Sequence, residues 1–119
     1  MKKYQKILVG TALLLAVTVT SAFAYSLGNG VFVGLRANAL WGYVQVQATI
    51  AGGKITRIQV LEYPNHTNRS NSISNYALPT LARQAMDSNS SSVDVISGAT
   101  LTSEAFAKSL TSALKKAAQ

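Results

Sequence analysis

The residues with the clearest potential for chemistry lie in one polar stretch, Asp94–Ser103, just before a helical run at the end of the chain. The apolar residues Val93, Val95 and Ile96 predict a short strand over Val93–Ile96, and Gly98 permits a tight bend. The bend would present the Thr100 hydroxyl just before the N-terminus of a helix over Glu104–Ala118. Since N–H groups there lack intrahelical partners and the helix dipole is positive at that end, a phosphate group would be favoured.

A plainer interpretation of the same residues remains open. Polar turns that contain glycine are common before helices, and Thr102 or Ser103 could simply cap the helix that follows. In that case Thr100 would be one more residue of an ordinary capped turn.

The segment Asp94–Thr100 reads Asp-x-x-Ser-Gly-Ala-Thr and is followed by Thr102 and Ser103. It resembles the flavinylation motif Asp-x-x-Ser/Thr-Gly-Ala-Thr of the FMN-binding domain family. This family includes the C subunit of the sodium-translocating NADH:quinone reductase and many small secreted flavoproteins. The resemblance implies that FMN is attached covalently to Thr100 by a phosphoester bond, with Thr102 beside it in the cofactor site. It also implies that an FAD:protein FMN transferase reads the residues Asp94, Ser97, Gly98 and Ala99.

The same resemblance implies an exported flavoprotein that carries electrons and receives them from a separate membrane-bound donor. The sequence shows no nucleophile–base pair, carboxylate dyad or metal cluster, so we do not expect the chain to be an enzyme. Thr100 would be an acceptor in the reaction of the transferase, which would bring its own Mg²⁺ and FAD. The alternative is a secreted binding or structural module with the same fold that holds flavin non-covalently or not at all.

The first half of this domain reads as strands. Val31–Gly34 follows an Asn-Gly turn signal, and Tyr43–Ile50 alternates apolar and polar residues. Ala51–Gly53 predicts a hairpin turn, from which Lys54–Glu62 returns as a strand. The alternation predicts one inward face in the first hairpin strand, made of Val44, Val46, Ala48 and Ile50. In the second, it places Ile58 and Val60 on one face and Ile55 and Leu61 on the other.

The second half reads as a polar segment, Tyr63–Ser74, followed by helices. We expect His66 to be a solvated loop residue. Arg69 is a candidate contact for the FMN phosphate or a ring carbonyl, or else a surface charge. Two helical pieces are predicted, Ser72–Ala77 and Pro79–Ser88, with Pro79 in the first turn of the second piece.

The C-terminal helix carries an apolar face that should pack on the hairpin sheet; its residues are Phe106, Leu110, Ala113, Leu114 and Ala117. Together these elements predict an α+β fold, a small antiparallel sheet with helices packed on one face, over about residues 29–118. The aromatic residues Trp41, Tyr43 and Tyr63 could flank a flavin ring or belong to the core.

The N-terminal residues 1–24 have the three parts of a bacterial secretory signal: a basic start, a charge-free run and an Ala-x-Ala cleavage site ending at Ala24. An uncleaved anchor is the alternative, because the charge-free run could span a thin bilayer. Either way, the FMN-binding domain, residues 25–119, is expected outside the cytoplasm.

Composition excludes several other classes of function. Of the 11 basic residues, Lys2, Lys3 and Lys6 belong to the signal segment, and the others are dispersed, so nucleic-acid binding is not expected. The chain has no Cys, which excludes Cys-ligated iron–sulfur clusters and covalent haem attachment. Redox chemistry would therefore need an organic cofactor or a site without Cys.

Overall fold

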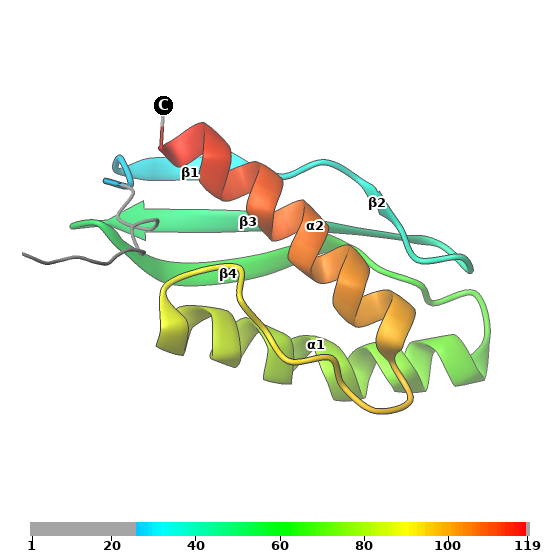
Figure 1. The fold of residues 1–119 in the computed structure, drawn as a ribbon. Coiled ribbons are helices and arrows are strands. Elements are labelled where there is room, and N and C mark those ends of the chain that lie inside the picture. Colours follow the sequence, from blue (N-terminus) through cyan, green and yellow to red (C-terminus); the bar gives the residue numbers. More distant parts are fainter. Residues whose placement is uncertain (1–25, 119) are drawn as a thin grey trace, which may run out of the picture.

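The computed structural model describes residues 26–118, which form one antiparallel sheet and two helices (Figure 1). The predicted signal segment, residues 1–24, lies outside the described residues. In chain order the elements are β1 (Gly30–Val33), β2 (Ala37–Asn38), β3 (Tyr43–Ala51), β4 (Lys54–Glu62), α1 (Asn68–Ser88) and α2 (Thr100–Ala117). Within this described part, no helix is long and apolar enough to cross a membrane.

The strand β3 is the centre of the sheet. β4 pairs along one of its edges, while β1 and β2 pair one after the other along the opposite edge, all antiparallel. Both helices pack on the same face of this sheet, with α2 lying obliquely across β3 and α1 beside β4 (Figure 1). The predicted α+β arrangement is confirmed.

The hairpin of β3 and β4 forms where the sequence predicts it. Gly52 and Gly53 have φ values of 62° and 77°, as the two-residue turn that best fits twisted strands requires. The four inward residues of β3 that the alternation predicts are all buried: Val44, Val46, Ala48 and Ile50. They form the core with the apolar face of α2, where Phe106, Leu110, Ala113 and Ala117 are buried and Leu114 is partly so.

A bulge in β4 places Ile55 on the sheet face opposite to the one predicted. The register shifts between Thr49 and Ile50, so that Ile50 lies opposite Ile55 while Thr49 lies opposite Arg57. The extra residue in β4 turns Ile55 to the same side as Ile58, and Ile55 is only 5% exposed. Simple alternation therefore placed Ile55 on the wrong face, because a bulge breaks the two-residue period.

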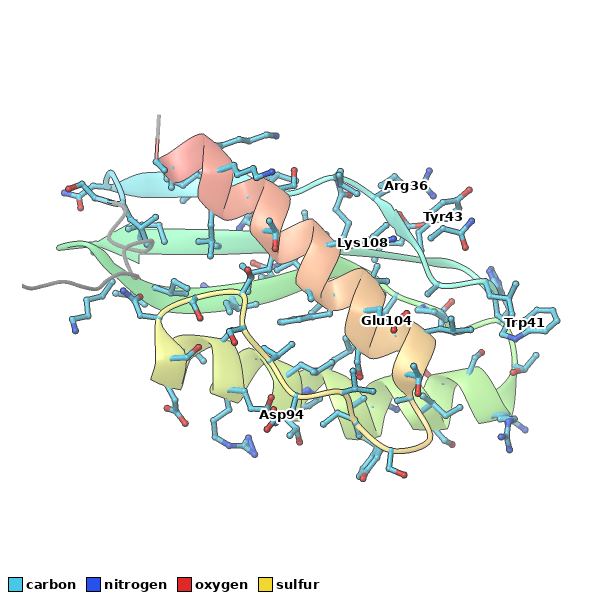
Figure 2. The ribbon with its side chains drawn as sticks, in the orientation of Figure 1. Arg36, Trp41, Tyr43, Asp94, Glu104 and Lys108 are labelled. Carbon is cyan, nitrogen blue, oxygen red and sulfur yellow. The ribbon has the colours of Figure 1, made fainter. Side chains whose placement is uncertain are left out.

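A second shift places Glu62 opposite Gln45, on the sheet face that the helices leave open. There Arg36 donates two hydrogen bonds to the Glu62 carboxylate, at 2.7 and 2.8 Å, and its guanidinium lies 4.1 Å from the centre of the Tyr43 ring (Figure 2). These hydrogen bonds hold the pKa of Glu62 below its ordinary value and raise the pKa of Arg36. The cluster is solvent-exposed, so it orders the sheet edge more than it stabilises the fold.

The helix α1 is continuous, whereas the sequence predicted two pieces separated before Pro79. It begins at Asn68, inside the polar segment Tyr63–Ser74 and four residues before the predicted start at Ser72, and it contains Pro79 in its interior. Pro79 has no N–H group, so it cannot donate the helix hydrogen bond to the carbonyl of Asn75. Because Asn75 is exposed, water can donate to that oxygen instead. The buried residues Leu78 and Leu81 on either side keep the helix packed across the proline.

β1 and β2 pair with the same edge of β3, and a gap separates them. The helix α2 fills this gap. A β-carbon on Gly34 would lie 1.9 Å from the backbone oxygen of Ser109, so only glycine allows the helix to come this close. Inside the gap the N–H group of Val46 donates to Ser109 Oγ at 2.9 Å in a buried site. One turn further along, Ser112 Oγ accepts from the exposed N–H group of Leu35. The helix thus completes the hydrogen bonding that the broken strand edge lacks.

We predict that Ser109→Ala lowers the free energy of unfolding by about 1–3 kcal/mol, because it leaves the buried N–H group of Val46 without an acceptor. Ser112→Ala is the matched control, and should change it by no more than about 0.5 kcal/mol, since water can reach Leu35. Urea unfolding of the two variants checks this. Equal effects would show that the contact in the gap has no special energetic role.

Candidate functional site

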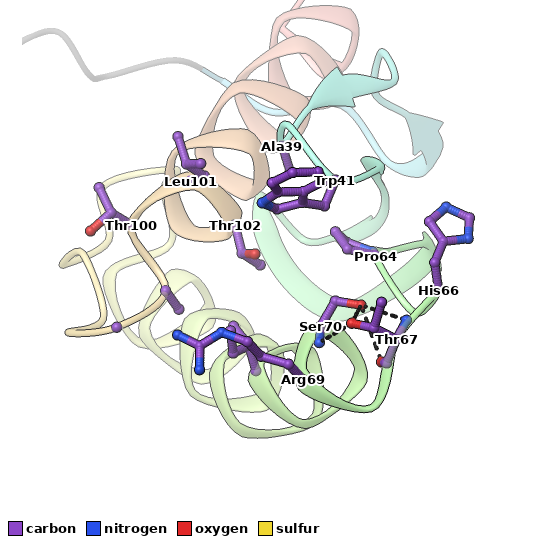
Figure 3. A pocket seen from close by; sticks show the side chains of 13 residues that line it. Ala39, Trp41, Pro64, His66, Thr67, Arg69, Ser70, Thr100, Leu101 and Thr102 are labelled. Carbon is purple, nitrogen blue, oxygen red and sulfur yellow. Dashed lines mark hydrogen bonds between the residues drawn. The ribbon is translucent and has the colours of Figure 1, made fainter.

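A cavity of about 670 Å³ lies at the end of the sheet where three separate segments meet (Figure 3). The β2–β3 turn, the β4–α1 connection with the first turns of α1, and the motif turn with the start of α2 each form part of its wall. The lining residues are Ala39, Trp41, Pro64, His66, Thr67, Arg69, Ser70, Ile73, Gly98, Ala99, Thr100, Leu101 and Thr102.

The motif turn has the predicted bend at Gly98. Its φ is 83°, and the Ala99 N–H group donates to the Ile96 carbonyl at 2.9 Å, closing a four-residue turn. Val93–Ile96, however, is not a strand, because it pairs with no strand of the sheet. Instead, two of its N–H groups, those of Asp94 and Ile96, donate to the side chains of Gln84 and Ser103.

The helix α2 begins four residues earlier than predicted, so Thr100 is its first residue. Its N-cap is Ala99, and the predicted capping by Thr102 or Ser103 is wrong, because both lie inside the first turn. The Ser103 hydroxyl donates to the Ala99 carbonyl at 2.7 Å and is buried. No side chain caps the N-terminus of α2, so the first N–H groups of this helix keep their capacity to bind an anion.

The N-terminus of α1, on the other side of the cavity, is capped, in contrast to that of α2. Thr67 and Ser70 form a reciprocal capping box, in which each hydroxyl accepts from the backbone N–H group of the other residue (Figure 3). Neither helix has an acidic residue in its first turn, and within residues 26–118 no carboxylate lines the cavity. The cavity therefore combines two helix N-termini, of which only that of α2 is uncapped.

Arg69 lies in the first turn of α1 rather than in a loop, and it is exposed at the wall of the cavity. Figure 3 shows its guanidinium pointing toward the motif turn. Among the lining residues of the described part of the chain, it is the one Lys or Arg; His66 is exposed on the connection before α1, as predicted. The structure thus brings Arg69 and Thr100 to one cavity from positions 31 residues apart in the chain.

Of the three aromatic candidates, only Trp41 lines the cavity, and its side chain is 71% exposed. It follows Leu40, whose φ of 74° is unusual for a residue with a side chain. The N–H group of Trp41 donates to the carbonyl of Ala39 at 2.9 Å across this tight turn, and the Leu40 N–H group donates to Asn38 Oδ1. The strained turn holds a large flat apolar ring at the mouth of the cavity.

The remaining motif residues divide between the cavity and the outer side of the turn. Asp94 and Ser97 are exposed and do not line the cavity, whereas Gly98, Ala99 and Thr102 do. Asp94 is near α1, since its N–H group donates to Gln84 Oε1 (Figure 2). The predicted site residues thus divide into a set that faces the cavity and a set that faces solvent.

Sequence reasoning missed several of the lining residues. Ile73 follows Ser70 by three residues and Arg69 by four, the spacings that make side chains neighbours on a helix, so a correct start of α1 would have placed it beside them. Ala39 and Pro64 carry no local signal, because only the pairing of β2 and β4 with β3 brings them to this end of the sheet.

Two comparisons with known proteins bear on the family and the fold of this chain. Residues 40–115 match the model of a family described as FMN-binding domain, a range that includes the whole motif. The crystal structure of the CPE2226 protein from Clostridium perfringens has a similar fold, with a TM-score of 0.58 and 25% sequence identity. That similarity covers 76% of this chain and 88% of the Clostridium protein. No curated protein matches the chain.

We predict that Gly98→Ala lowers the free energy of unfolding by about 1–2 kcal/mol, because alanine is strained at a φ of 83°. Nothing lies within 4 Å of the position that its β-carbon would take, so the cost comes from the backbone alone. Gly98→Asn should cost less, since asparagine tolerates left-handed φ values. Urea unfolding tests this order; an alanine variant as stable as the wild type would contradict the assigned turn.

Proposed function

Because the chain belongs to the FMN-binding domain family, we propose that it is an exported electron carrier whose FMN is joined through its phosphate to Thr100 Oγ. This proposal rests on one observation: Thr100, the uncapped start of α2 and Arg69 all lie at one cavity. An attached phosphate needs an exposed hydroxyl, N–H donors and a cation at one place, and these three features supply them.

The cavity fits FMN in size and in the distribution of its chemistry. Its volume of about 670 Å³ lies in the range of small-molecule sites, which is roughly 300–1,000 Å³. The wall near Trp41 is apolar and includes Ala39 and Pro64, which suits a flat aromatic ring system. The motif side is polar and suits the phosphate, so the two ends of the cavity match the two ends of the cofactor.

Each residue of the site then has a distinct task. The first N–H groups of α2 and the Arg69 guanidinium would hold the phosphate. Trp41 would cover the ring and exclude water from one side of it. Bound FMN supplies one- and two-electron redox chemistry, and the protein tunes that chemistry through the charges and hydrogen bonds around the ring.

Attachment requires a second protein, an FAD:protein FMN transferase. In that transfer the bond from Thr100 Oγ to the phosphorus of the FMN half of FAD forms, the bond from that phosphorus to AMP breaks, and the hydroxyl proton leaves. Among the described residues, no carboxylate lines the cavity to take this proton, and His66 lies on the other side of the cavity from Thr100 (Figure 3). The transferase would supply the base, and the exposure of Thr100 would give it access.

The location of the protein is part of the same proposal. The basic start, charge-free run and Ala-x-Ala site in residues 1–24 favour export, by a cleaved signal or a retained anchor. A covalent bond suits such a location, because a dissociating FMN would be lost outside the cell. An electron donor bound to the membrane would complete the pathway.

We predict that the protein purified under denaturing conditions, from cells that contain the transferase, is heavier by one FMN minus one water, and that Thr100→Ala abolishes this mass. Thr80→Ala, in the middle of α1, is the control and should keep the full modification. Intact-mass spectrometry measures both. Flavin lost on unfolding would favour the alternative of non-covalent binding, and a Thr100→Ala protein that keeps the added mass would place the attachment elsewhere.

A further inference from the structure

Among the described residues, Thr102 is the one buried polar side chain without a partner in the protein. Its exposed fraction is 6%, and within residues 26–118 its hydroxyl forms no hydrogen bond. Buried hydroxyl groups in folded proteins are nearly always paired, so this exception calls for an explanation. The other buried polar side chains each form a hydrogen bond with a backbone group at 2.9 Å or less; they are those of Ser74, Ser103 and Ser109.

The position of Thr102 in α2 explains why its hydroxyl is left unpaired. A threonine inside a helix can donate to the carbonyl four residues before it, as Thr111 does to Ala107 at 2.7 Å. For Thr102 that residue is Gly98, which belongs to the turn before the helix, and no such bond forms within the described residues. Figure 3 shows the hydroxyl pointing into the cavity instead. A ligand in the cavity can therefore reach it.

The phosphate proposed at Thr100 does not account for this hydroxyl. Residues two apart on a helix do not face each other, and Thr100 is exposed whereas Thr102 is buried. The cavity that Thr102 lines also has an apolar wall, formed by Ala39, Trp41 and Pro64, which suits a flat ring system better than a phosphate. A flavin ring carries carbonyl oxygens and ring nitrogens along one edge, and these can accept a hydrogen bond from a hydroxyl.

We propose that Thr102 binds the flavin ring: its hydroxyl donates to a carbonyl oxygen or a nitrogen of the isoalloxazine. This rests on the proposed function, because it concerns the ring of the same cofactor. In a pocket with mostly apolar walls, a few well-placed polar groups fix the orientation of the ligand. Hydrogen bonds to the ring also tune the electronics of a bound flavin. Thr102 thus serves the ring, whereas Arg69 and the start of α2 serve the phosphate.

The test measures the affinity for riboflavin, which has the ring but no phosphate, in flavin-free full-length protein that carries Thr100→Ala. In this parent we expect Thr102→Val to weaken riboflavin binding at least about tenfold, because valine has nearly the same shape without the hydroxyl. Thr102→Ser keeps the hydroxyl and should restore most of the affinity. Quenching of flavin fluorescence measures each affinity. Equal affinities for Thr102→Val and the parent would overturn the proposal.

Thr111→Val is the matched control, since Thr111 lies on the same helix but outside the cavity. It should bind riboflavin as the parent does. It should also lower the thermal midpoint of the flavin-free protein, because it removes a hydroxyl that is paired with Ala107 and Ser91. Thr102→Val should leave that midpoint unchanged or raise it, since it removes a buried hydroxyl without a partner. A midpoint lowered as much as in Thr111→Val would indicate a purely structural role and overturn the proposal.

Two further comparisons separate this proposal from the attachment itself. Riboflavin binding does not depend on a bond to Thr100, and the intact mass of the wild type tests that bond. If Thr102→Val weakens the binding of FMN but not of riboflavin, the hydroxyl binds the phosphate and the assignment to the ring is overturned. If riboflavin binds too weakly to measure, the loaded proteins decide: FMN attachment should raise the thermal midpoint less in Thr102→Val than in the wild type, and equal gains would overturn the proposal.

Discussion

The contact between Gly34 and α2 is the constraint on which the site depends. A β-carbon at Gly34 would overlap the Ser109 carbonyl oxygen, and the Ser109 hydroxyl accepts the buried N–H group of Val46. Together they fix the height and position of α2 over the break between β1 and β2. Thr100 lies about two and a half turns from Ser109 on the same helix, so this contact also fixes where the first turn of α2 meets the cavity.

The two helix N-termini at the cavity show how the fold prepares for an anion. An uncapped helix start normally costs about 1 kcal/mol relative to a capped one. At α1 the Thr67–Ser70 box removes that cost, whereas at α2 the N-cap is Ala99 and offers no side-chain acceptor. Under the proposed function, a phosphate on Thr100 would take the place of the missing cap, with Arg69 adding charge compensation across the cavity.

Local patterns predicted the parts of the structure that are local. Strict alternation identified β3, two glycines identified the hairpin, and helical spacing identified the buried face of α2.

The errors arose where tertiary contacts override local preference. Ile55 faces the core because of a bulge, and α1 continues through Pro79 because buried residues flank it. Val93–Ile96 has the composition of a strand, but side chains of the two helices take its N–H groups. The motif indicated Thr100 as the candidate attachment site. That Trp41 and Arg69 line the same cavity could not be predicted, because it depends on the topology of the sheet.

Phosphorus NMR can detect directly whether one phosphate joins FMN to Thr100. The protein would be isolated from cells with the transferase, unfolded, and freed of small molecules before its ³¹P spectrum is followed with pH. A phosphate diester has no second ionisation, whereas a phosphate monoester titrates with a pKa of about 6. For the attached cofactor we expect one phosphorus signal whose position stays constant between about pH 5 and pH 8. A spectrum without phosphorus, or a signal that shifts with a midpoint near about pH 6, would contradict it.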